Sequence, residues 1–456
     1  MSVVIVGAGP AGTRAAEVLV GTGLRPVVID EAPDNGGRIY QRQPAGFRRS
    51  ARALYGFEAA KAQAIHAIFD RLRPSIDFRP RTLAWNLRPG ILDTICDGKP
   101  NAVPFAQTIL CTGAMDRVIP LPGWTLPGVF TLGGSQIALK AQGCAVGART
   151  AFLGTGPLLY LVAYQYARAG AHVVAVLDTT SFATKAAQAF GLMRGGATFA
   201  KGLYYMAWLR ARGIPIAEGV TPLAIEGNGQ VESLSWRDAG GLRHEAAVDA
   251  VALGFGLKPE AQLADLAGVP FDFDPVQHNW VPCKDPTGRT SVEGVFLAGD
   301  GSCIQGADLA EAAGARAAWA VLASRGLAVD ARAVARLDAR LAAGGSFRAA
   351  LERAFPFPAK LAADMTDDTI LCRCEAITAG ELRAAADEAL ATLPPSEVNR
   401  AKALTRIGMG RCQGRVCGPA AAEVLAAALS CPMDQVGRLR GQPPVKPIPI
   451  LPAEAA

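Results

Sequence analysis

Short aliphatic runs alternate with glycine-rich turns and amphipathic stretches along the first third of the chain. The run VVIV at residues 3–6 predicts a strand, and the sequence GAGPAG after it leads into a predicted helix over 13–20. Two more strands are predicted, over 26–29, which ends at Asp30-Glu31, and over 108–111, which ends at Thr112-Gly113. This order of strand, turn, helix and strand predicts a β–α–β unit with a parallel sheet.

The same pattern begins again near Thr150, where a strand over 151–153 leads into the turn Gly154-Thr155-Gly156-Pro157. A second β–α–β unit therefore follows the first. The other elements predicted beyond the turn are helices over 158–168 and 309–324, strands over 173–177, 249–253 and 294–298, and a hairpin over 223–236. Helical sequence of mixed charge continues to about Phe355.

Composition narrows the function classes. With 456 residues, of which 50% are hydrophobic and 19% charged, the chain has enough apolar material for large cores, which excludes a mostly disordered protein. Ten cysteines are too few for a disulfide scaffold, and a net charge of +6 does not by itself indicate nucleic acid, so we expect no nucleic-acid partner. No targeting segment or long uncharged apolar run is visible, so we expect a cytoplasmic location, with peripheral association with the inner membrane left open.

Gly7, Gly9 and Gly12 form a GxGxxG motif directly after the first strand. Gly7 permits the tight turn, Gly9 lets a pyrophosphate approach the backbone, and Gly12 allows close packing of helix and strand. Glu31 ends the next strand about 20 residues further on, where an acid accepts hydrogen bonds from a ribose diol. These residues predict a dinucleotide-binding site.

Three further motifs favour a flavin. Gly36-Gly37 lies just beyond the acid, Thr112-Gly113 closes the third strand, and VFLAGDG at 295–301 contains Gly299 and Asp300. In this order they resemble the glutathione-reductase and thioredoxin-reductase superfamily. The resemblance implies FAD, with Asp300 on the ribityl chain, and Gly37, Thr112, Gly113 and Gly299 at the cofactor. An adenine nucleotide alone in the same site remains the alternative.

The second nucleotide site departs from the motif, because Leu159 replaces its third glycine and opposes close helix–strand contact. We therefore expect a domain that keeps its fold but binds NAD(P)H weakly or not at all. The redox-active cysteine pair of the superfamily is also missing. Five isolated cysteines, most of them expected to be small core residues, are Cys96, Cys111, Cys144, Cys283 and Cys303.

Four cysteines near the C-terminus form two pairs, Cys372 with Cys374 and Cys412 with Cys417. Four thiolates can hold one 2Fe–2S cluster, and no histidine follows His278, which disfavours a Rieske centre. The one-residue spacing of the first pair fits structural zinc poorly. We expect nearby glycines to let backbone N–H groups reach the sulfurs, and nearby arginines to offset the anionic charge: Gly408, Gly410, Gly414, Arg373, Arg406, Arg411 and Arg415.

The strings CRCEAITAGEL and TRIGMGRCQGRVCG resemble the small 2Fe–2S domain of bacterioferritin-associated ferredoxin. The flavoprotein part, this module and a proline-rich tail together resemble the alpha subunits of hetero-oligomeric, dye-linked amine and imino-acid dehydrogenases. Subunits of opine oxidase, D-hydroxyproline dehydrogenase and hydrogen cyanide synthase belong to this group. The stretch 121–143 and the tail 440–449 are typical of it.

That resemblance implies partners. The amine would be oxidised at an FAD in a beta subunit resembling D-amino-acid oxidase, and electrons would pass to a quinone or dye. It also allows an FMN at the subunit junction and a small ferredoxin-like gamma subunit. No residue of this chain stands out as a catalytic base. A stand-alone NAD(P)H-dependent reductase remains the competing hypothesis, and a non-catalytic partner of bacterioferritin is disfavoured by the large flavoprotein part.

The predicted fold class is α/β, with two dinucleotide-binding, glutathione-reductase-like domains and a small helical 2Fe–2S domain. The first domain closes only when the chain returns after the inserted second domain. The predicted divisions are an FAD-binding domain over 1–122 and 286–330, a degenerate NAD(P)-binding-like domain over 123–285, a helical linker over 331–368, a 2Fe–2S domain over 369–430 and a proline-rich tail over 431–456. The tail is expected to lie over the surface or over a partner.

Overall fold

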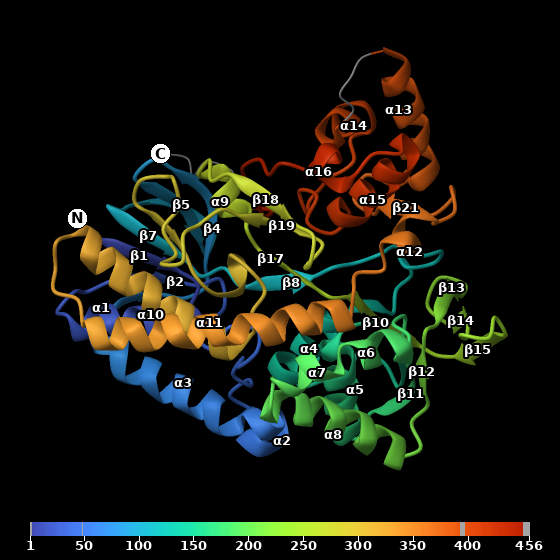
Figure 1. The fold of residues 1–456 in the computed structure, drawn as a ribbon, viewed down its shortest axis with the longest axis horizontal. Helices are drawn as coiled ribbons and strands as arrows, with labels where there is room; N and C mark the ends of the chain where they lie inside the picture. Colours follow the sequence, from blue (N-terminus) through green and yellow to red (C-terminus); the bar gives the residue numbers. More distant parts are fainter. Residues whose placement is uncertain (1, 48, 393–396, 450–456) are drawn as a thin grey trace.

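Alternating side chains of the N-terminal strand enter two different buried layers, which fixes the first sheet between them. The computed structural model describes residues 2–47, 49–392 and 397–449, without the side chains of 388–392 (Figure 1). Val3 and Ile5 of β1 (Val3–Val6) pack with one hydrophobic cluster, whereas Val4 and Val6 pack with another. This period of two is the expected pattern for a strand buried on both faces.

The first sheet is parallel, in the order β20-β7-β1-β2-β3. Its other strands are β2 (Val27–Ile29), β3 (Asp77–Arg79), β7 (Gln107–Leu110) and β20 (Val295–Leu297). Because β20 comes after the whole second unit in the sequence, the chain leaves this sheet and later returns to complete it. The strands predicted from the aliphatic runs are all present.

Helices cover one face of this sheet and an antiparallel meander covers the other. The helices are α1 (Pro10–Gly21), α3 (Ala59–Leu72) and α10 (Ala307–Ser324); the opposite face carries β4 (Thr82–Arg88), β5 (Ile91–Cys96), β6 (Lys99–Pro104) and α9 (Gln262–Leu266). Helices α1 and α10 approach closely, since a Cβ on Gly314 would lie 2.0 Å from the carbonyl oxygen of Ala11. The meander was not predicted.

The second unit repeats the plan with a parallel sheet in the order β12-β11-β10-β16-β9. Leu153 of β10 faces one core, whereas Phe152 beside it faces helices α5 and α8. The elements are β9 (Val129–Thr131), β10 (Arg149–Thr155), β11 (His172–Asp178), β12 (Ile216–Glu218), β16 (Ala250–Phe255), α4 (Leu132–Ile137), a π-helical turn (Ala138–Gln142), α5 (Pro157–Arg168), α6 (Phe182–Ala187), α7 (Ala189–Met193) and α8 (Ala197–Ala211). The predicted hairpin is present as β13 (Thr221–Glu226) and β14 (Ser233–Arg237), extended by β15 (Arg243–Ala247).

Two crossing strands and one long helix join the two units. Strand β8 (Ala114–Asp116) pairs antiparallel with β17 (Leu257–Pro259), one leaving the first unit and one returning to it. Helix α11 (Ala331–Ala354) contacts α10 in the first unit and α6 and α7 in the second (Figure 1). Smaller elements complete this part: α2 (Ala51–Tyr55), β18 (Phe271–Asp274), β19 (Asn279–Pro282) and a 3-10 turn (Gly299–Gly301).

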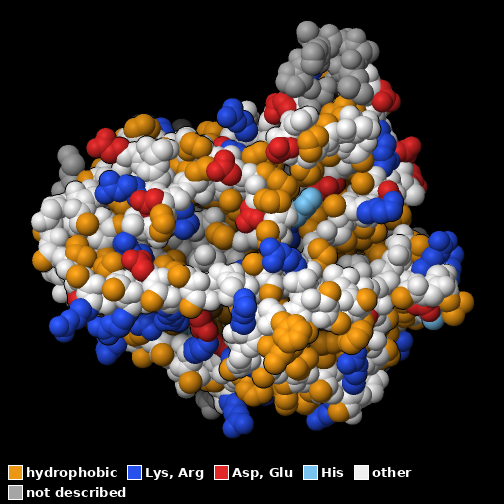
Figure 2. Space-filling view, viewed as in Figure 1, with side chains coloured by type: hydrophobic (Ala, Val, Ile, Leu, Met, Phe, Trp, Pro, Cys, Tyr) orange, Lys and Arg blue, Asp and Glu red, His pale blue; other side chains and the backbone are white. Residues whose placement is uncertain are grey.

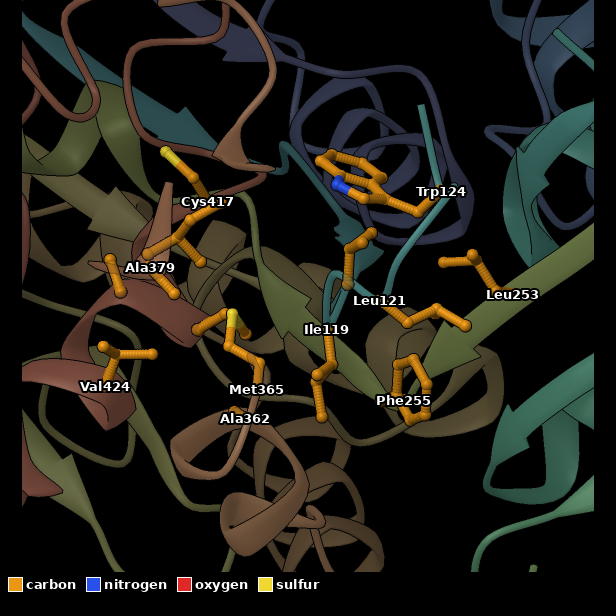
Figure 3. Close-up of a cluster of buried hydrophobic side chains, with 14 of the residues drawn as sticks. Ile119, Leu121, Trp124, Leu253, Phe255, Ala362, Met365, Ala379, Cys417 and Val424 are labelled. Atoms are coloured by element: carbon orange, nitrogen blue, oxygen red, sulfur yellow. The ribbon is translucent and has the colours of Figure 1, made fainter. Parts of the chain in front are cut away.

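The C-terminal module is mainly helical and shares a core with the second unit. It contains α12 (Ala359–Ala363), β21 (Ile370–Cys372), β22 (Ile377–Thr378), α13 (Ala379–Thr392), α14 (Val398–Thr405), α15 (Gly418–Leu429) and α16 (Met433–Val436). Figure 3 shows Leu121 and Phe255 of the second unit in the same cluster as Met365, Cys417 and Val424. The α/β fold class with a helical C-terminal domain is thereby confirmed.

One smaller expectation needs correction. Of the five isolated cysteines only Cys111 is buried; Cys144 is exposed and the other three are partly exposed, because they lie at strand ends and in loops. The described part of the tail lies over the first unit, where Val445 is buried in the core.

Among the described residues, no helix has the length and apolarity needed to cross a bilayer.

Candidate functional site

The glycine turn after β1 is built so tightly that only glycine fits. Gly7 has a φ of 105°, and a Cβ there would lie 2.3 Å from the carbonyl oxygen of Cys111. A Cβ on Gly12 would lie 1.8 Å from the carbonyl oxygen of Gly7. The turn therefore holds β1, β7 and the start of α1 in close contact, as the motif predicts.

A second loop closes against this turn. A Cβ on Gly37, whose φ is 59°, would lie 3.1 Å from the Cα of Gly9. Helix α1 begins at Pro10 and has no side-chain cap, so the first N–H groups of the helix are available to a phosphate. Two backbones thus meet where the pyrophosphate of a dinucleotide lies in such motifs.

The two acidic residues after β2, Asp30 and Glu31, have different contacts. The carboxylate of Asp30 accepts hydrogen bonds from the backbone N–H of Ala8 at 2.6 Å and of Ala32 at 2.7 Å, so it anchors the glycine turn. Burial raises the pKa of Asp30, and these two bonds oppose that shift. The motif spacing did not predict this role of Asp30. The only indication in the sequence was that Asp30 directly precedes Glu31.

Glu31, the residue predicted to bind the ribose, lies between two cations. Its Oε1 is 2.6 Å from Nη2 of Arg38, and its Oε2 is 2.5 Å from Nζ of Lys446. Desolvation opposes ionisation of Glu31, but the charges of Lys446 and Arg38 outweigh it and lower the pKa of the carboxyl. Lys446 lies far away in sequence, so no local pattern could have indicated it.

The middle and late motifs meet beside the glycine turn. A Cβ on Gly301 would lie 2.4 Å from Oγ1 of Thr112, and one on Gly299 would lie 2.9 Å from Cβ of Ala11. The carboxylate of Asp300 accepts two backbone bonds at Oδ1, from Gln305 at 2.8 Å and Gly306 at 2.9 Å. Burial raises the pKa of Asp300.

The structure therefore brings together all the residues predicted for the first site at the carboxyl ends of strands β1, β2, β7 and β20. This end of the sheet offers free helix N–H groups, two glycine backbones in close approach and an ionised carboxylate at the ribose position. These features fit a dinucleotide such as FAD. They fit the adenosine and phosphates of a smaller adenine nucleotide equally well.

The corresponding acid of the second site is bonded within the chain. Asp178, at the end of β11, accepts hydrogen bonds from the hydroxyl of Tyr160 at 2.5 Å, from Nζ of Lys185 at 2.8 Å and from the backbone N–H of Thr180 at 2.8 Å. The side chain of Asp178 is fully buried. A nicotinamide nucleotide would have to displace these partners to reach the carboxylate.

Helix α11 and the residue after it lie over the second site. Phe355, which follows the helix, lies edge-on to the ring of Tyr160 and 5.6 Å from Nζ of Lys185. The helix packs tightly on α7, because a Cβ on Gly191 would lie 2.5 Å from that of Ala350. Leu159 is itself buried in the core of the unit. These contacts agree with the expectation of a degenerate nucleotide site.

The four predicted cluster ligands come together. The thiol of Cys417 hydrogen-bonds with those of Cys372 and Cys412, and the thiols of Cys374 and Cys412 also interact. The bond from Cys417 lowers the pKa of Cys372 to about 6 and that of Cys412 to about 5. The same bonds raise the pKa of Cys417, and burial raises that of Cys374.

Backbone donors surround the sulfurs. N–H groups of Gly408 and Glu375 approach Cys372, and those of Gly414 and Val416 approach Cys412. The loop can turn its N–H groups inward because it enters the left-handed region repeatedly, at Arg406, Gly408, Gln413 and Gly414. Gly410 has a different role from the expected one: a Cβ there would lie 2.2 Å from that of Cys374.

The arginines near the cluster are engaged with other groups. Arg406 pairs with Glu375 at 3.0 Å, Arg415 pairs with Glu260 at 3.4 Å, and the guanidinium of Arg373 lies 5.7 Å from the centroid of the Trp124 ring. The ion pairs partly neutralise the charges of Arg406 and Arg415, and the backbone N–H groups are the more direct stabilisers of anionic sulfur.

In the part of the chain that the structure describes, no group of three or more His, Cys, Asp or Glu side chains is arranged to hold a single metal ion. The four thiols instead form a series of contacts, in which Cys417 approaches Cys372 and Cys412, and Cys412 also approaches Cys374. Four thiols with backbone donors are the set that a 2Fe–2S cluster uses. The residues present therefore fit that group.

A cavity of about 110 Å³ lies between the first unit and the cysteine module. Glu260 links its two sides. The carbonyl of Glu260 accepts a bond from Thr112 Oγ1 at 2.5 Å and its N–H donates to the carbonyl of Gly113 at 2.9 Å, while its carboxylate pairs with Arg415. Arg415 in turn donates to the carbonyl of Cys412 at 3.1 Å. The first nucleotide site and a cluster ligand are thus joined through two residues, neither link having been predicted.

The fold and both sites define a two-dinucleotide-fold flavoprotein with a 2Fe–2S module. A model of the pyridine nucleotide-disulphide oxidoreductase family matches residues 1–317, and a BFD-like 2Fe-2S binding domain matches 370–427. The chain therefore belongs to the pyridine nucleotide-disulphide oxidoreductase family, whose domain implies FAD, and it carries a C-terminal 2Fe–2S domain.

Curated relatives extend over the full chain. An opine oxidase subunit of Rhizobium meliloti is 34% identical, with 98% of this chain and 86% of the relative covered. Hydrogen cyanide synthase subunit HcnB of Pseudomonas aeruginosa is 31% identical, with 98% of this chain and 97% of the relative covered. The predicted membership in this group of oxidoreductase subunits is confirmed.

Solved structures share the fold. The L-proline dehydrogenase of P. horikoshii superposes with a TM-score of 0.72 at 18% identity, covering 98% of this chain and 78% of that one. The thioredoxin reductase of T. acidophilum gives a TM-score of 0.52 at 20% identity, covering 71% of this chain and 98% of that one. The second structure covers a smaller share of this chain than the first, and both comparisons show the fold alone.

Proposed function

We propose that the chain is the electron-transfer subunit of a dye-linked amine or imino-acid dehydrogenase of the D-hydroxyproline or opine type. A partner subunit resembling D-amino-acid oxidase would oxidise the C–N bond at its own FAD. This chain would pass the electrons through its flavin and 2Fe–2S centre to a quinone or dye. The observation that carries the proposal is the short link from Thr112-Gly113 through Glu260 and Arg415 to Cys412.

The two groups suit such a relay, since a flavin accepts two electrons and can release them singly, whereas a 2Fe–2S centre takes one at a time. The chain's own residues hold these groups and set their electrostatics. Backbone N–H groups at Cys372 and Cys412 stabilise negative charge on sulfur, which favours the reduced state of the centre.

Three of the four histidines are bonded within the chain, and the fourth, His172, is exposed, which supports the proposal that this chain supplies no base for amine oxidation. The Nε2 atom of His66 lies 2.7 Å from the carbonyl oxygen of Tyr40, that of His244 pairs with Asp238, and that of His278 pairs with Glu423. Amine chemistry in a partner chain agrees with these contacts. The names of the full-length relatives, each a subunit, support the same division of labour.

The partner needs a surface, and the second unit offers one. Figure 2 shows hydrophobic side chains gathered over the helices of this unit. The large exposed residues on and around α6, α7 and α8 are Phe182, Phe190, Met193, Leu203 and Tyr204, of which Phe190 is 89% exposed. Phe57 of the first unit, also exposed, lies edge-on to Tyr204. Arg194, Arg210 and Arg212 lie on or beside the same helices. Aromatic residues, Met and Arg are enriched at protein interfaces, so we place the partner here, with an acidic rim facing these arginines.

A copurification experiment with the partner subunit tests the proposal. The isolated chain should not oxidise D-hydroxyproline, opines or other amines with a dye acceptor, whereas the assembled complex should. Phe190→Asp combined with Leu203→Asp should abolish assembly and complex activity but keep both cofactors. Turnover of an amine by the chain alone would contradict the proposal.

Hydrogen cyanide synthase is the second candidate, favoured by the similarity to HcnB over nearly the whole of both chains. The same relay would serve that complex, and only the substrate of the partner would differ. An FMN at the subunit junction and a small gamma subunit stay predictions from the resemblance, as do the domain divisions. A stand-alone NAD(P)H reductase is disfavoured by the bonded state of Asp178.

A further inference from the structure

The segment after α16 runs from the cysteine module onto the first unit. Arg438 forms a two-pronged ion pair with Asp265 of α9, with N–O distances of 2.7 and 2.8 Å. Leu439 packs on the cluster loop, since a Cβ on Gly408 would lie 2.6 Å from its Cδ1. The backbone N–H of Gly441 then donates to Asp265 at 2.7 Å. Both ends of this stretch are therefore tied to α9.

The next residues anchor the segment on the first sheet's outer layer. Val445 is 3% exposed and belongs to the hydrophobic cluster of β1, β2 and the β4–β6 meander. Its N–H donates to the carbonyl of Trp85 in β4 at 3.1 Å. Packing and a backbone hydrogen bond fix the position of Val445. The backbone of Lys446, the next residue, therefore starts from a fixed position.

Lys446 reaches the ribose-binding acid. Its Nζ lies 2.5 Å from Oε2 of Glu31, and both side chains remain partly exposed. An ammonium group has three donors and a carboxylate oxygen has two lone pairs, so this pair leaves capacity on each side. A ribose hydroxyl can donate to Glu31 and at the same time accept from Lys446.

We propose that residues 438–446 form a wall at the adenosine end of the first nucleotide site and that Lys446 is a further binding residue for the ribose diol of an adenine nucleotide. This inference rests on the nucleotide site of the proposed function and names a ligand residue for it. It holds for FAD and for a smaller adenine nucleotide alike, because both contain ADP.

Equilibrium dialysis of the full-length chain against labelled ADP and labelled 2′,3′-dideoxy-ADP tests the assignment. Lys446→Met keeps the aliphatic stem and removes the donors, so it should weaken ADP binding roughly tenfold, the size of a charged hydrogen bond. Binding of the dideoxy nucleotide, which lacks both hydroxyls, should change little. Lys360→Met is the matched control, since Lys360 also pairs with a carboxylate, that of Asp364 at 2.5 Å, and both side chains of this pair are exposed.

Equal loss for both nucleotides would overturn the assignment, because it would mean that Lys446 only supports the fold. Unchanged binding of both by Lys446→Met would overturn it as well. A wild-type chain that retains no adenine nucleotide and binds no ADP would instead contradict the nucleotide site of the proposed function. The visible spectrum of the 2Fe–2S centre, recorded for each variant, shows that the module is intact.

Discussion

At the residue scale, neighbouring side chains of the same type have different roles. Asp30 and Glu31 are adjacent acids, yet Asp30 is bonded to the backbone of the glycine turn and Glu31 faces cations at the ribose position. The motif spacing singles out Glu31 as the ribose acid, and the bonded state of Asp30 agrees with that choice. Lys446, one of the two partners of Glu31, comes from a remote chain segment, and spacing contains no information about it.

Replacing any one of Cys372, Cys374, Cys412 and Cys417 by Ser should bleach the visible 2Fe–2S spectrum and stop electron flow to an external acceptor. The four thiols form one set, so a missing ligand cannot be supplied by a neighbour. The nucleotide of the first site should remain bound. Cys431→Ser is the control, since Cys431 lies outside both pairs, and an unchanged cluster spectrum in any ligand variant would count against the assignment.

His66 should contribute to loss of stability in acid. Burial lowers its pKa, with the bond to the Tyr40 carbonyl opposing this shift, so the folded state favours neutral histidine. The unfolded chain binds the proton more readily than the folded chain. The contribution of neutral His66 to the free energy of unfolding is therefore fully present above the unfolded pKa, near 6.5, and is lost as pH falls through the folded pKa.

Urea unfolding at several pH values checks this prediction. His66→Gln, which keeps an N–H donor for Tyr40, should flatten the fall in the free energy of unfolding between neutral and mildly acidic pH. The exposed His172 provides the control as His172→Gln. Identical pH dependence in the wild type and His66→Gln would refute the role of His66.

At the element scale, long periodic segments were predictable and edge structure was not. The β1–α1–β2 and β10–α5–β11 units follow from buried aliphatic runs and glycine turns, whose periodicity is local. The β4–β6 meander escaped prediction because it contains prolines and charged residues, with β6 almost entirely exposed. The position of the tail on the first unit depends on long-range contacts, such as the hydrogen bond from Val445 to Trp85 in β4, which no local sequence pattern predicts.

The Arg438–Asp265 pair should stabilise the attachment of the cysteine module to α9. Arg438→Met removes a two-pronged, largely buried pair, and the guanidinium also lies 3.7 Å from the Phe271 ring centroid. We expect a loss of roughly 1.5–3 kcal/mol in the free energy of unfolding, measured by urea denaturation. Lys360→Met breaks an exposed pair and should cost less than about 1 kcal/mol. Equal effects of the two variants would contradict the anchoring role.

At the scale of the whole molecule, the predicted first nucleotide site lies beside the cysteine module, whereas side chains of the same chain cover the second. The cysteine module shares a core with the second unit (Figure 3). Its ligand loop touches the first unit through the ion pair of Arg415 and Glu260. Helix α11 and Phe355 cover the region of Asp178 and Lys185. These contacts support our proposal that no nicotinamide cofactor delivers electrons at the second site, whereas delivery from a partner chain does not need one.

Anaerobic stopped-flow mixing of the purified chain with NADH or NADPH tests this central claim most directly. The account predicts that flavin absorbance stays constant on mixing, while a chemical reductant such as dithionite reduces both the flavin and the 2Fe–2S centre of the same sample. Rapid bleaching of the flavin by either nicotinamide nucleotide would contradict the account and would identify the chain as a self-contained reductase.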